Sequence, residues 1–402
     1  MVRKSIALLL PLSVALLASC GGSSGGGGAV VVPPAKPPIV VSMNSADAPD
    51  YLCDGFEDDV EINLALRSAD TSTTAGRTVL LKEGTYHVVR SIIVTSHLTL
   101  RGAGAATIIQ LEDNAPSMLA TAGILRLKDD SQRGLDKRVT HVTLEDFVVD
   151  GNRAHQLAAT DEKKYGFYAE GDFIVLRRLV ARNCAGYGFD PHSTQDTVPS
   201  LHVTIEDCEA FGNAADGFTL DMVQSSTFSR NHAHDNDRHG INLTSTTAGV
   251  TISNCRSIHN GATGLVGQNG THDLVVQACE LANNAFEGIY LRDADGCNLL
   301  GNTLRENVRS GITLRLSDRT TISGNRLEMN DPGSAARAVV LVDSATVNIV
   351  RSNTILSATA RAGVLEAGTS DYNNVRDNVI DVESGPVVLI GPHSTQSGNV
   401  IP

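Results

Sequence analysis

The chain has 402 residues, of which 41% are hydrophobic and only 4% aromatic, and it contains 37 glycines and no tryptophan. A formal net charge of −13 argues against nucleic acid as a partner. The same charge does not exclude an anionic sugar, because net charge governs long-range steering and says little about one local surface. Few aromatic residues and many glycines favour a narrow, repetitive interior over a globular core.

The first 19 residues have the pattern of a secretory signal. An apolar run over residues 6–18 follows two basic residues and is too short for a membrane-spanning helix. The sequence LASC followed by Gly21 resembles the bacterial lipobox, which predicts that Cys20 is lipidated. Gly21 replaces the aspartate that holds lipoproteins at the inner membrane, so the resemblance implies the outer membrane or the cell surface, on its periplasmic or extracellular side.

Residues 20–44 are rich in Gly and Ser and then in Pro, which predicts a tether that is flexible at first and semi-rigid later. Residues 45–402 contain no further linker and are expected to form one domain. Near its start, residues 58–69 (DDVEINLALRSA) predict a short amphipathic helix with acidic residues in its first turn. We expect this helix to cap one end of the domain.

Five glycines recur through the middle of the chain at steps of 23, 24, 24 and 23 residues. Each precedes an alternating apolar and polar tetrad: FTLD, INLT, LVGQ, IYLR and ITLR. The five glycines are Gly217, Gly240, Gly264, Gly288 and Gly311. Alternation with period two predicts strands, and a period of about 23 residues predicts one coil of a solenoid. The fold class is therefore all-β, a right-handed parallel β-helix, with about 15 coils in residues 45–402.

In such a stack, equal positions of successive coils form ladders about 4.8 Å apart. One predicted column contains small polar side chains nine residues before each glycine, and it is extended upstream by one cysteine: Cys184, Cys208, Asn231, Cys255, Cys279 and Asn302. We expect an interior or turn ladder, with the disulfide state of its cysteines left open. No CxxC or Cys/His pair has a zinc-ligand spacing, and the metal ligands stay unknown.

The outward column is where chemistry is expected. Four residues after each glycine stand Asp221, Thr244, Gln268, Arg292 and Arg315. Aligning Gly188 with Gly217 directs Asp190 and His192 outward, places His192 on Asp221, and leaves Tyr187 just before the strand. A carboxylate, an imidazole and a phenol, followed by two arginines, predict a binding face for a long anionic ligand.

The motif Tyr187-Gly-Phe-Asp190-Pro-His192 closely resembles the YGFDPH signature of mannuronan C5-epimerases, which convert β-D-mannuronate to α-L-guluronate in alginate. Further motifs resemble the same family in the same order: DGFTLD (216–221), NDRHG (236–240) and GPHSTQSG (391–398). The likeness covers residues 45–402 and implies the catalytic module alone, without the calcium-binding nonapeptide repeats that extracellular members often add. Calcium is therefore expected as a possible cofactor by family analogy only, and no organic cofactor is expected.

The resemblance implies that His192 and Tyr187 carry proton transfer and that Asp190 and Asp221 are essential beside them. It also implies that cations and strong donors face the substrate carboxylate, by position Arg238, Lys163 and His239, with Arg292 and Arg315 as further sugar contacts. Lys164 is adjacent to Lys163, and a strand would direct these two side chains to opposite faces.

Chemistry explains these residue types. Removing the C5 proton of a uronate gives an enolate-like dianion, so donors must neutralise its carboxylate. A base and an acid must then lie on opposite sides of the ring, and His192 has an ordinary pKa close to neutrality. Either Asp190 or Asp221 can orient the imidazole, and Asp221 can alternatively carry a proton for the substrate carboxylate. The residues alone leave these alternatives open.

Two other functions fit the same sequence. An alginate lyase would abstract the same C5 proton and then expel the oxygen at C4. A non-catalytic β-helix that binds polysaccharide at the cell surface would need no such cluster of reactive side chains. The expected partner in every case is an anionic polysaccharide, bound by a monomer that a lipid anchors to the membrane.

Overall fold

The computed structural model describes residues 37–69, 76–116, 123–128, 138–158, 160, 163–193, 198–328 and 338–402. The predicted signal, Cys20 and most of the predicted tether lie outside these residues. Ile39–Ser42 already form strand β1, which pairs in parallel with β3 (Arg77–Leu81). The folded part therefore begins before residue 45, where the sequence had placed its start. Within the described part of the chain, no helix has the length and apolar character needed to cross a membrane.

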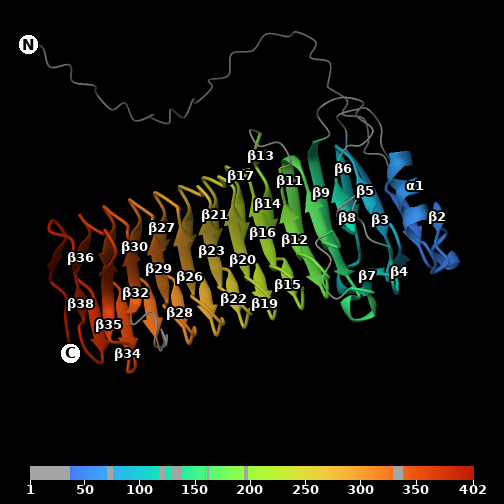
Figure 1. Ribbon diagram of the computed structural model, residues 1–402. Helices are drawn as coiled ribbons and strands as arrows, with labels where there is room; N and C mark the ends of the chain where they lie inside the picture. The colour runs from blue at the N-terminus through green and yellow to red at the C-terminus, as the bar shows by residue number, and fades with distance from the viewer. Residues whose placement is uncertain are drawn as a thin grey trace, which may run out of the picture. The chain divides into compact units, whose positions relative to one another are not determined.

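The described residues between 37 and 402 wind into a parallel β-helix with three strand-bearing faces (Figure 1), which confirms the predicted fold class. One face is a 12-stranded sheet whose strands lie beside one another in chain order. Its strands are β5 (Ile92–Val94), β8 (Leu125–Leu127), β10 (Phe167–Ala169), β12 (Phe189–Pro191), β16 (Phe218–Asp221), β20 (Ile241–Thr244), β23 (Leu265–Gln268), β26 (Ile289–Arg292), β29 (Ile312–Arg315), β32 (Ala338–Asp343), β35 (Ala362–Ala367) and β38 (Val387–Val388).

The other two faces join into one 25-stranded sheet, because two 12-residue strands, β9 (Val139–Asp150) and β11 (Gly171–Arg182), run across both. One face continues through β1, β3, β6 (Leu98–Arg101), β14 (Thr204–Glu206), β18 (Thr227–Ser229), β21 (Thr251–Ser253), β24 (Val275–Gln277), β27 (Asn298–Leu300), β30 (Thr321–Ser323), β33 (Ile349–Arg351), β36 (Asn374–Arg376) and β39 (Thr395–Ser397). The other has β4 (Gly84–Val88), β7 (Thr107–Leu111), β15 (Glu209–Phe211), β19 (His232–His234), β22 (Arg256–Ile258), β25 (Glu280–Ala282), β28 (Thr303–Arg305), β31 (Arg326–Glu328), β34 (Thr354–Ser357) and β37 (Val379–Val382).

Short elements complete the described chain. β2 (Tyr51–Leu52) pairs with β1, and β13 (Ser200–Leu201) pairs with β17 (Val223–Gln224). Three 3-10 turns lie at Ser45–Asp47, Gly104–Ala106 and Arg153–His155.

The expected number of coils was wrong. The 12-stranded sheet gives 12 coils on its face, not about 15. The period of 23–24 residues holds in the middle of the chain, but β5, β8 and β10 begin at residues 92, 125 and 167, so the early coils are longer. Dividing the domain length by the regular period therefore overcounts.

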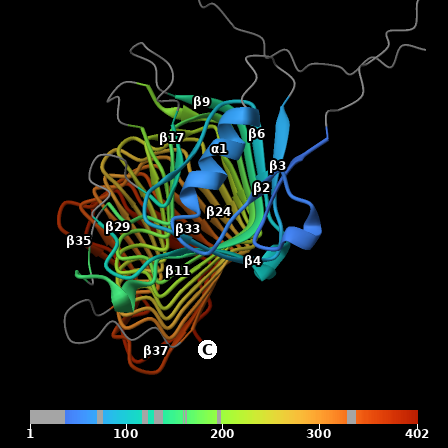
Figure 2. The ribbon, with the colours of Figure 1, turned by 90° about the vertical axis from the view of Figure 1, so that its right-hand side faces the viewer.

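The only helix of the described residues, α1 (Asp59–Ala69), covers the N-terminal end of the stack (Figure 2). Its face of Ile62, Ala65, Leu66 and Ala69 is buried, while Asp59 and Glu61 lie in the first turn, where the helix dipole favours negative charge. This apolar face packs against the first strands and removes the exposed end of the hydrophobic interior from water. The capping helix is confirmed.

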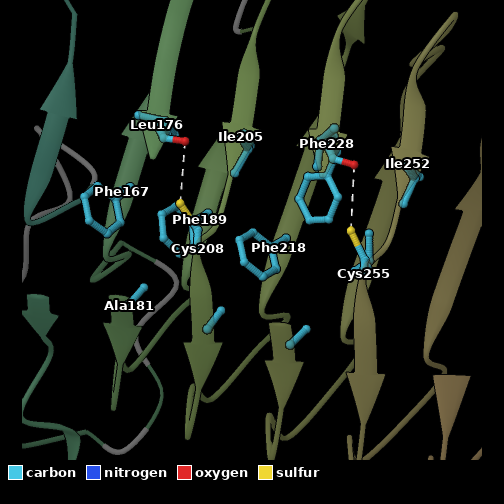
Figure 3. Packing of buried hydrophobic residues seen from close by; sticks show 14 of the residues in the cluster. Phe167, Leu176, Ala181, Phe189, Ile205, Cys208, Phe218, Phe228, Ile252 and Cys255 are labelled. Carbon is cyan, nitrogen blue, oxygen red and sulfur yellow. Dashed lines mark hydrogen bonds between the residues drawn. The ribbon is translucent and has the colours of Figure 1, made fainter. Parts of the chain in front are cut away.

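Inside the stack, inward side chains from successive coils form continuous columns (Figure 3). Phe167, Phe189 and Phe218 lie at equal positions of β10, β12 and β16, with ring centroids 4.5 and 4.7 Å apart and nearly parallel planes. The rings are fully buried, so each contributes roughly 2–3 kcal/mol by leaving water. This aromatic column fixes the register of the three coils that carry the predicted site.

Side-chain amides form the predicted ladder, though in more than one column. In the first column, Asn231 accepts a hydrogen bond from the backbone N–H of Cys208 at 2.9 Å, and Asn302 accepts one from Cys279 at 2.9 Å. A second column, which the sequence analysis missed, runs through the turn before the 12-stranded sheet: Asn213, Asn236, Asn260, Asn284 and Asn307. Among the described residues every cysteine is a free, buried thiol.

The assignment of Cys184 to the first column was wrong. Its backbone N–H donates to Oδ1 of Asn213 at 2.9 Å, so Cys184 occupies the second column. The chain between Cys184 and Cys208 contains the extra residues that follow His192, and these make a 24-residue spacing coincide with a different position in the coil. At this coil, an equal number of residues between two cysteines therefore does not place them at equal positions in successive coils.

The amide ladder also explains the recurring glycine. A Cβ on Gly217 would lie 2.8 Å from Nδ2 of Asn236 and 2.9 Å from the carbonyl oxygen of Gly240. At Gly264 the same atom would lie 2.7 Å from Nδ2 of Asn284. Real Cβ atoms do not approach heavy atoms so closely, so the amide of one coil demands glycine in the coil before it.

Candidate active site

The candidate site lies on the outer face of the 12-stranded sheet, over strands β10, β12, β16 and β20. The central column contains Tyr168, Asp190, Thr219 and Asn242 at equal positions. Although these side chains point outward, they are only 3–6% exposed. The face is therefore partly desolvated, and charges on it act at a lower effective dielectric constant than on an open surface.

His192 and Asp221 come together as the sequence alignment places them. Phe189 and Phe218 are paired in β12 and β16, so the residues three positions later lie side by side. Nδ1 of His192 is 3.3 Å from Oδ2 of Asp221 and 3.9 Å from Oδ1 of Asp190. Asp221 is thus the closer partner of the imidazole, and a proton on Nδ1 leaves the Nε2 lone pair for chemistry.

The backbone of His192 is held on both sides. Its N–H donates to the carbonyl oxygen of Ala169 at 2.7 Å, and its own carbonyl oxygen accepts from Oγ of Ser200 at 2.8 Å. The segment that follows is anchored by Arg138, which bonds to Asp172 and to the carbonyl oxygen of Pro199. Ser200 therefore helps to hold the backbone of His192.

The ionisation of the three central groups is linked. Burial lowers the pKa of His192, but the hydrogen bond to Asp221 and the charges of Asp190, Asp221 and Glu170 together raise it above its ordinary value. Burial raises the pKa of Asp221, and the bond to His192 outweighs this, so that the net pKa is lowered. The imidazole and Asp221 thus form a carboxylate–histidine pair.

Asp190 differs from Asp221. Burial raises its pKa to about 7, against the opposing charges of His192 and Lys163. Its Oδ1 atom is buried and has no hydrogen-bond partner among the described residues. A carboxyl group with a pKa close to neutrality exchanges a proton easily, and an unsatisfied buried oxygen favours a ligand that donates to it.

Tyr187 lies one position before the central strand. Burial raises the pKa of its phenol, the carboxylate of Asp216 raises it further, and a hydrogen bond from Arg238 lowers it. The net direction is upward, so the phenol is protonated at neutral pH and can donate. The Tyr187 ring also lies 5.1 Å from that of Tyr165 in the coil before it.

Asp216 organises the cationic side of the site, and the sequence analysis did not single it out. The residue is fully buried, and its Oδ1 accepts from the backbone N–H of His239 at 3.0 Å. Its Oδ2 accepts from Nδ2 of Asn242 at 2.9 Å, and Arg238 lies 3.7 Å from the carboxylate. Asp216 thereby positions Arg238, which is half-exposed on the same face.

The remaining predicted residues occupy different surroundings. The charge of Lys163 reaches Asp190, whereas the neighbouring Lys164 is buried and bonds to Gln156. The two lysines lie in the turn before β10 and not in a strand, so strand alternation does not set their directions. Nδ1 of His239 accepts from the backbone N–H of Thr263, and burial lowers its pKa, so this ring is neutral. Arg292 and Arg315 are paired in β26 and β29, further along the face, and both are exposed.

Tyr165, Tyr168 and Glu170 were also missed. The ring of Tyr168 lies 5.6 Å from that of His192, and Glu170, which is buried, forms an ion pair of 3.0 Å with Lys128. A signal for them was present, because Tyr165-Gly-Phe-Tyr-Ala-Glu170 repeats the Tyr-Gly-Phe of the next coil 22 residues earlier. The shared Gly-Phe pair aligns Tyr168 with Asp190 and Glu170 with His192.

The family profile of the right-handed β-helix region matches residues 137–304 and 239–400. The chain belongs to this family. It is 28% identical over 380 residues to the mannuronan C5-epimerase AlgE5 of Azotobacter vinelandii, a match that covers 86% of this chain and 37% of the relative. Alginate lyase 7 of the same organism is 28% identical over 384 residues, covering 86% of this chain and 42% of the relative.

Among solved structures, the A-module of mannuronan C5-epimerase AlgE4 from A. vinelandii superposes with a TM-score of 0.77 at 26% identity. The alignment covers 89% of this chain and all of that one. The chain therefore spans well under two thirds of the two curated relatives, yet the whole of one isolated module. The resemblance to mannuronan C5-epimerases that the motifs indicated is confirmed, and the handedness of the β-helix agrees with that of the family.

Proposed function

We propose that the protein is a mannuronan C5-epimerase that converts β-D-mannuronate to α-L-guluronate within alginate. The observation that carries the proposal is the cluster on the outer face of β12, β16 and β20, where His192 is paired with Asp221 beside Asp190, Tyr187 and Arg238. The likeness of nearly the whole described chain to epimerase modules supports the same reaction.

In the first step of the proposed reaction, the substrate carboxylate is neutralised. Arg238 is held by the buried carboxylate of Asp216, and Lys163 projects its charge toward Asp190. The unsatisfied Oδ1 of Asp190 can accept from a substrate hydroxyl or, when Asp190 is protonated, can donate to the carboxylate. Each contact gains strength as negative charge grows on the carboxylate during deprotonation.

In the second step, Nε2 of His192 removes the proton from C5. The C–H electron pair moves into the carboxylate to give the enolate-like dianion, and the proton passes to the imidazole. Asp221 stabilises the resulting imidazolium through Nδ1, which is the role of a carboxylate beside a histidine base. The raised pKa of His192 makes it a stronger base than a free imidazole.

In the third step, the phenol of Tyr187 returns a proton to the opposite face of C5. The enolate pair forms the new C–H bond, and the phenolate is transiently stabilised by Arg238, which already bonds to Tyr187. Proton exchange with solvent then resets both groups. No bond to the neighbouring sugar is broken, so the polymer keeps its length.

Alginate lyase activity is the second candidate, since a named lyase is among the relatives. The lyase reaction shares the first two steps. The enolate then expels the C4 oxygen, so that the glycosidic bond breaks and an unsaturated uronate remains. The two reactions differ only in whether protonation at C5 precedes loss of the C4 oxygen.

Incubation of the purified chain with polymannuronate tests both candidates. Proton NMR of the anomeric region is expected to show guluronate signals, and ultraviolet absorbance detects any unsaturated uronate. In deuterated water, deuterium should appear at C5 of each new guluronate. Folded protein that neither epimerises nor cleaves the polymer would favour a purely binding role.

Calcium is retained as a variable of this assay. The described residues form two clusters of three potential side-chain ligands, and one contains histidine while the other contains cysteine. Calcium prefers oxygen ligands throughout, so neither cluster fits it. No step of the proposed reaction is routed through the ion, and the assay is run with and without it.

We also propose that the chain acts as a monomer that Cys20 anchors to the outer membrane. The lipobox and the tether that follows it support this location. Replacing Cys20 with Ser should move the protein from the membrane fraction to the soluble fraction without changing its folding. Equal membrane retention of the variant would contradict the anchor.

A further inference from the structure

A cluster of two histidines and a glutamate lies on a face of the solenoid different from that of the candidate active site. His232 and His234 stand two residues apart on β19, so both point outward while Ala233 between them points inward. Glu209 lies opposite His232 on the adjacent strand β15. The proposed epimerase reaction uses none of these three side chains.

The spacing of the ligand atoms suits a small metal ion. Oε1 of Glu209 lies 3.1 Å from Nε2 of His234 and 3.6 Å from Nδ1 of His232. A tetrahedral zinc ion with bonds of about 2.0–2.2 Å places its ligand atoms about 3.3–3.5 Å from one another. One ligand atom from each of the three residues lies within 4.8 Å of the others, so small rotations of the side chains close the site.

His234 is oriented for metal binding by its surroundings. Its Nδ1 lies 2.6 Å from Oδ2 of Asp235, and its Nε2 lies 3.1 Å from Oε1 of Glu209. A proton on Nδ1 bonded to Asp235 would leave Nε2 free to bind a metal ion in place of the proton that it shares with Glu209. A carboxylate behind a histidine ligand is the usual outer partner in zinc sites. The ring also stacks on Phe211 at 4.9 Å with planes 8° apart, which restricts its rotation.

The arginine opposite His232 is already paired. Arg256 lies opposite His232 on β22, and its Nε forms an ion pair of 2.9 Å with Glu280. The three ligands are all partly exposed, with 19–40% of each side chain accessible to water. Water can therefore enter and occupy a fourth coordination position.

We propose that Glu209, His232 and His234 form a binding site for a divalent transition-metal ion of the zinc type, with a solvent molecule as the fourth ligand. Two imidazoles and one carboxylate are a donor set that zinc accepts and calcium does not favour. Because Glu209 and the two histidines belong to neighbouring coils, a bound ion would clamp β15 to β19.

The other cluster of potential ligands contrasts with this one. Asp58, beside Cys53, already accepts hydrogen bonds from the backbone N–H groups of Gly55 and His87 at 2.9 and 2.8 Å. Burial raises the pKa of the Cys53 thiol far above its ordinary value, so the thiolate that a metal needs is disfavoured. The side chains of that cluster therefore stabilise the N-terminal end of the stack and are not free to bind a metal ion.

The test uses the full chain, without a polyhistidine tag, after dialysis against a chelator. Zinc is titrated in competition with a chromophoric chelator, and cobalt is added in its place to record the visible absorption of a tetrahedral ion. One equivalent of zinc is expected to bind, to raise Tm and to give a tetrahedral cobalt spectrum. Calcium at the same concentration should produce neither effect.

Variants identify the ligands. His234→Ala and Glu209→Gln should each weaken zinc binding at least tenfold, and Asp235→Asn should weaken it about 10–100-fold by releasing the ring. His393→Ala is the matched control, because His393 also pairs with a carboxylate, Asp371, and stacks on an aromatic ring, but has no second histidine beside it. The control should bind zinc as the parent does.

Three results would overturn the proposal: zinc binding too weak to compete with the chelator, full affinity in both His234→Ala and Glu209→Gln, or loss of affinity in the His393→Ala control. Glu209→Gln changes one partly exposed atom and is expected to fold, so the proposal stays testable if a histidine variant does not. Circular dichroism of each variant confirms that a lost site does not reflect a lost fold.

Discussion

The coils that carry the candidate site differ from the regular coils that follow them. From β23 to β29, the amide of each coil bonds to the backbone and the amide of the coil before it, so the buried polar atoms of these ladders are paired. At β12 the ladder position is taken by Cys184, and Asp190 nearby keeps an unpaired buried oxygen. Repetition gives stability, and chemistry is found where the repeat is interrupted.

The largest expected effect is a loss of activity from substitutions in the coils that carry the candidate site. His192→Ala or Tyr187→Phe should lower kcat about 10²–10⁴-fold, because each removes a group that transfers a proton. Tm should change little, since neither side chain belongs to an amide ladder or to the buried aromatic column. The measurement is kcat on polymannuronate with Tm from calorimetry. His202→Ala, on another face, is the control, and a His192→Ala variant with parental kcat would remove this residue from the reaction.

The next effect is on stability in the regular coils. Asn284→Ala removes the acceptor of the Asn260 backbone N–H and the donor to the Ser257 carbonyl oxygen. Unpaired buried groups of this kind should lower the free energy of unfolding by about 2–4 kcal/mol. Chemical denaturation measures the loss. Asn298→Ala, on the outward side of β27, should cost less than about 0.5 kcal/mol, and equal losses in the two variants would argue against the ladder.

A smaller effect is an increase in the free energy of unfolding from a substitution in the candidate site. The native state raises the pKa of Asp190 from its ordinary value of 3.8 to about 7. The stability from this group is therefore fully present below pH 3.8 and is lost as pH rises through 7. Asp190→Asn mimics the neutral form. It should therefore raise the free energy of unfolding at pH 8 by on the order of 1–3 kcal/mol while lowering activity.

The pH dependence checks this sign. Denaturation at pH 5 and pH 8 should show that the gain from Asp190→Asn is larger at pH 8. A gain that is equal at the two values, or larger at pH 5, would mean that the carboxyl group is not held protonated.

The smallest effect concerns the exposed arginines. Arg292→Ala or Arg315→Ala should raise KM a few-fold with kcat unchanged, because solvent-exposed charges contribute about 0–1 kcal/mol. The increase should shrink at high salt. Arg305→Ala, on another face and paired with Glu280, is the control. An unchanged KM in both variants would mean that only the coils that carry the candidate site contribute to substrate recognition.

The sequence predicted the architecture well because glycine spacing and strand alternation are periodic signals. The capping helix followed from the amphipathic pattern of residues 58–69, and the pairing of His192 with Asp221 followed from the alignment of Gly188 with Gly217. Counting coils failed, because the insertions before β8 and β10 are not periodic. The position of Cys184 failed for the same reason, since the residues added after His192 shift the register by part of a coil.

The missing parts of the site are those that depend on packing rather than on motif. Asp216 is recognisable only from its burial and from its bonds to His239 and Asn242. Likewise, the nearness of Asp221 rather than Asp190 to the imidazole is a matter of about half an ångström, which no spacing rule resolves.

The amide ladder has a direction, and this direction bears on how the chain is made. The amide oxygen of Asn236 accepts a hydrogen bond from the backbone N–H of Asn213, one coil earlier. The amide oxygen of Asn260 accepts one from Asn236 in the same way, so each amide bonds to the coil on its N-terminal side. A chain that emerges N-terminus first thus completes the bonds of one coil only when the next has been synthesised. The last coil to emerge from a ribosome or a membrane pore would therefore lack the acceptors of its ladder hydrogen bonds until the following coil has emerged.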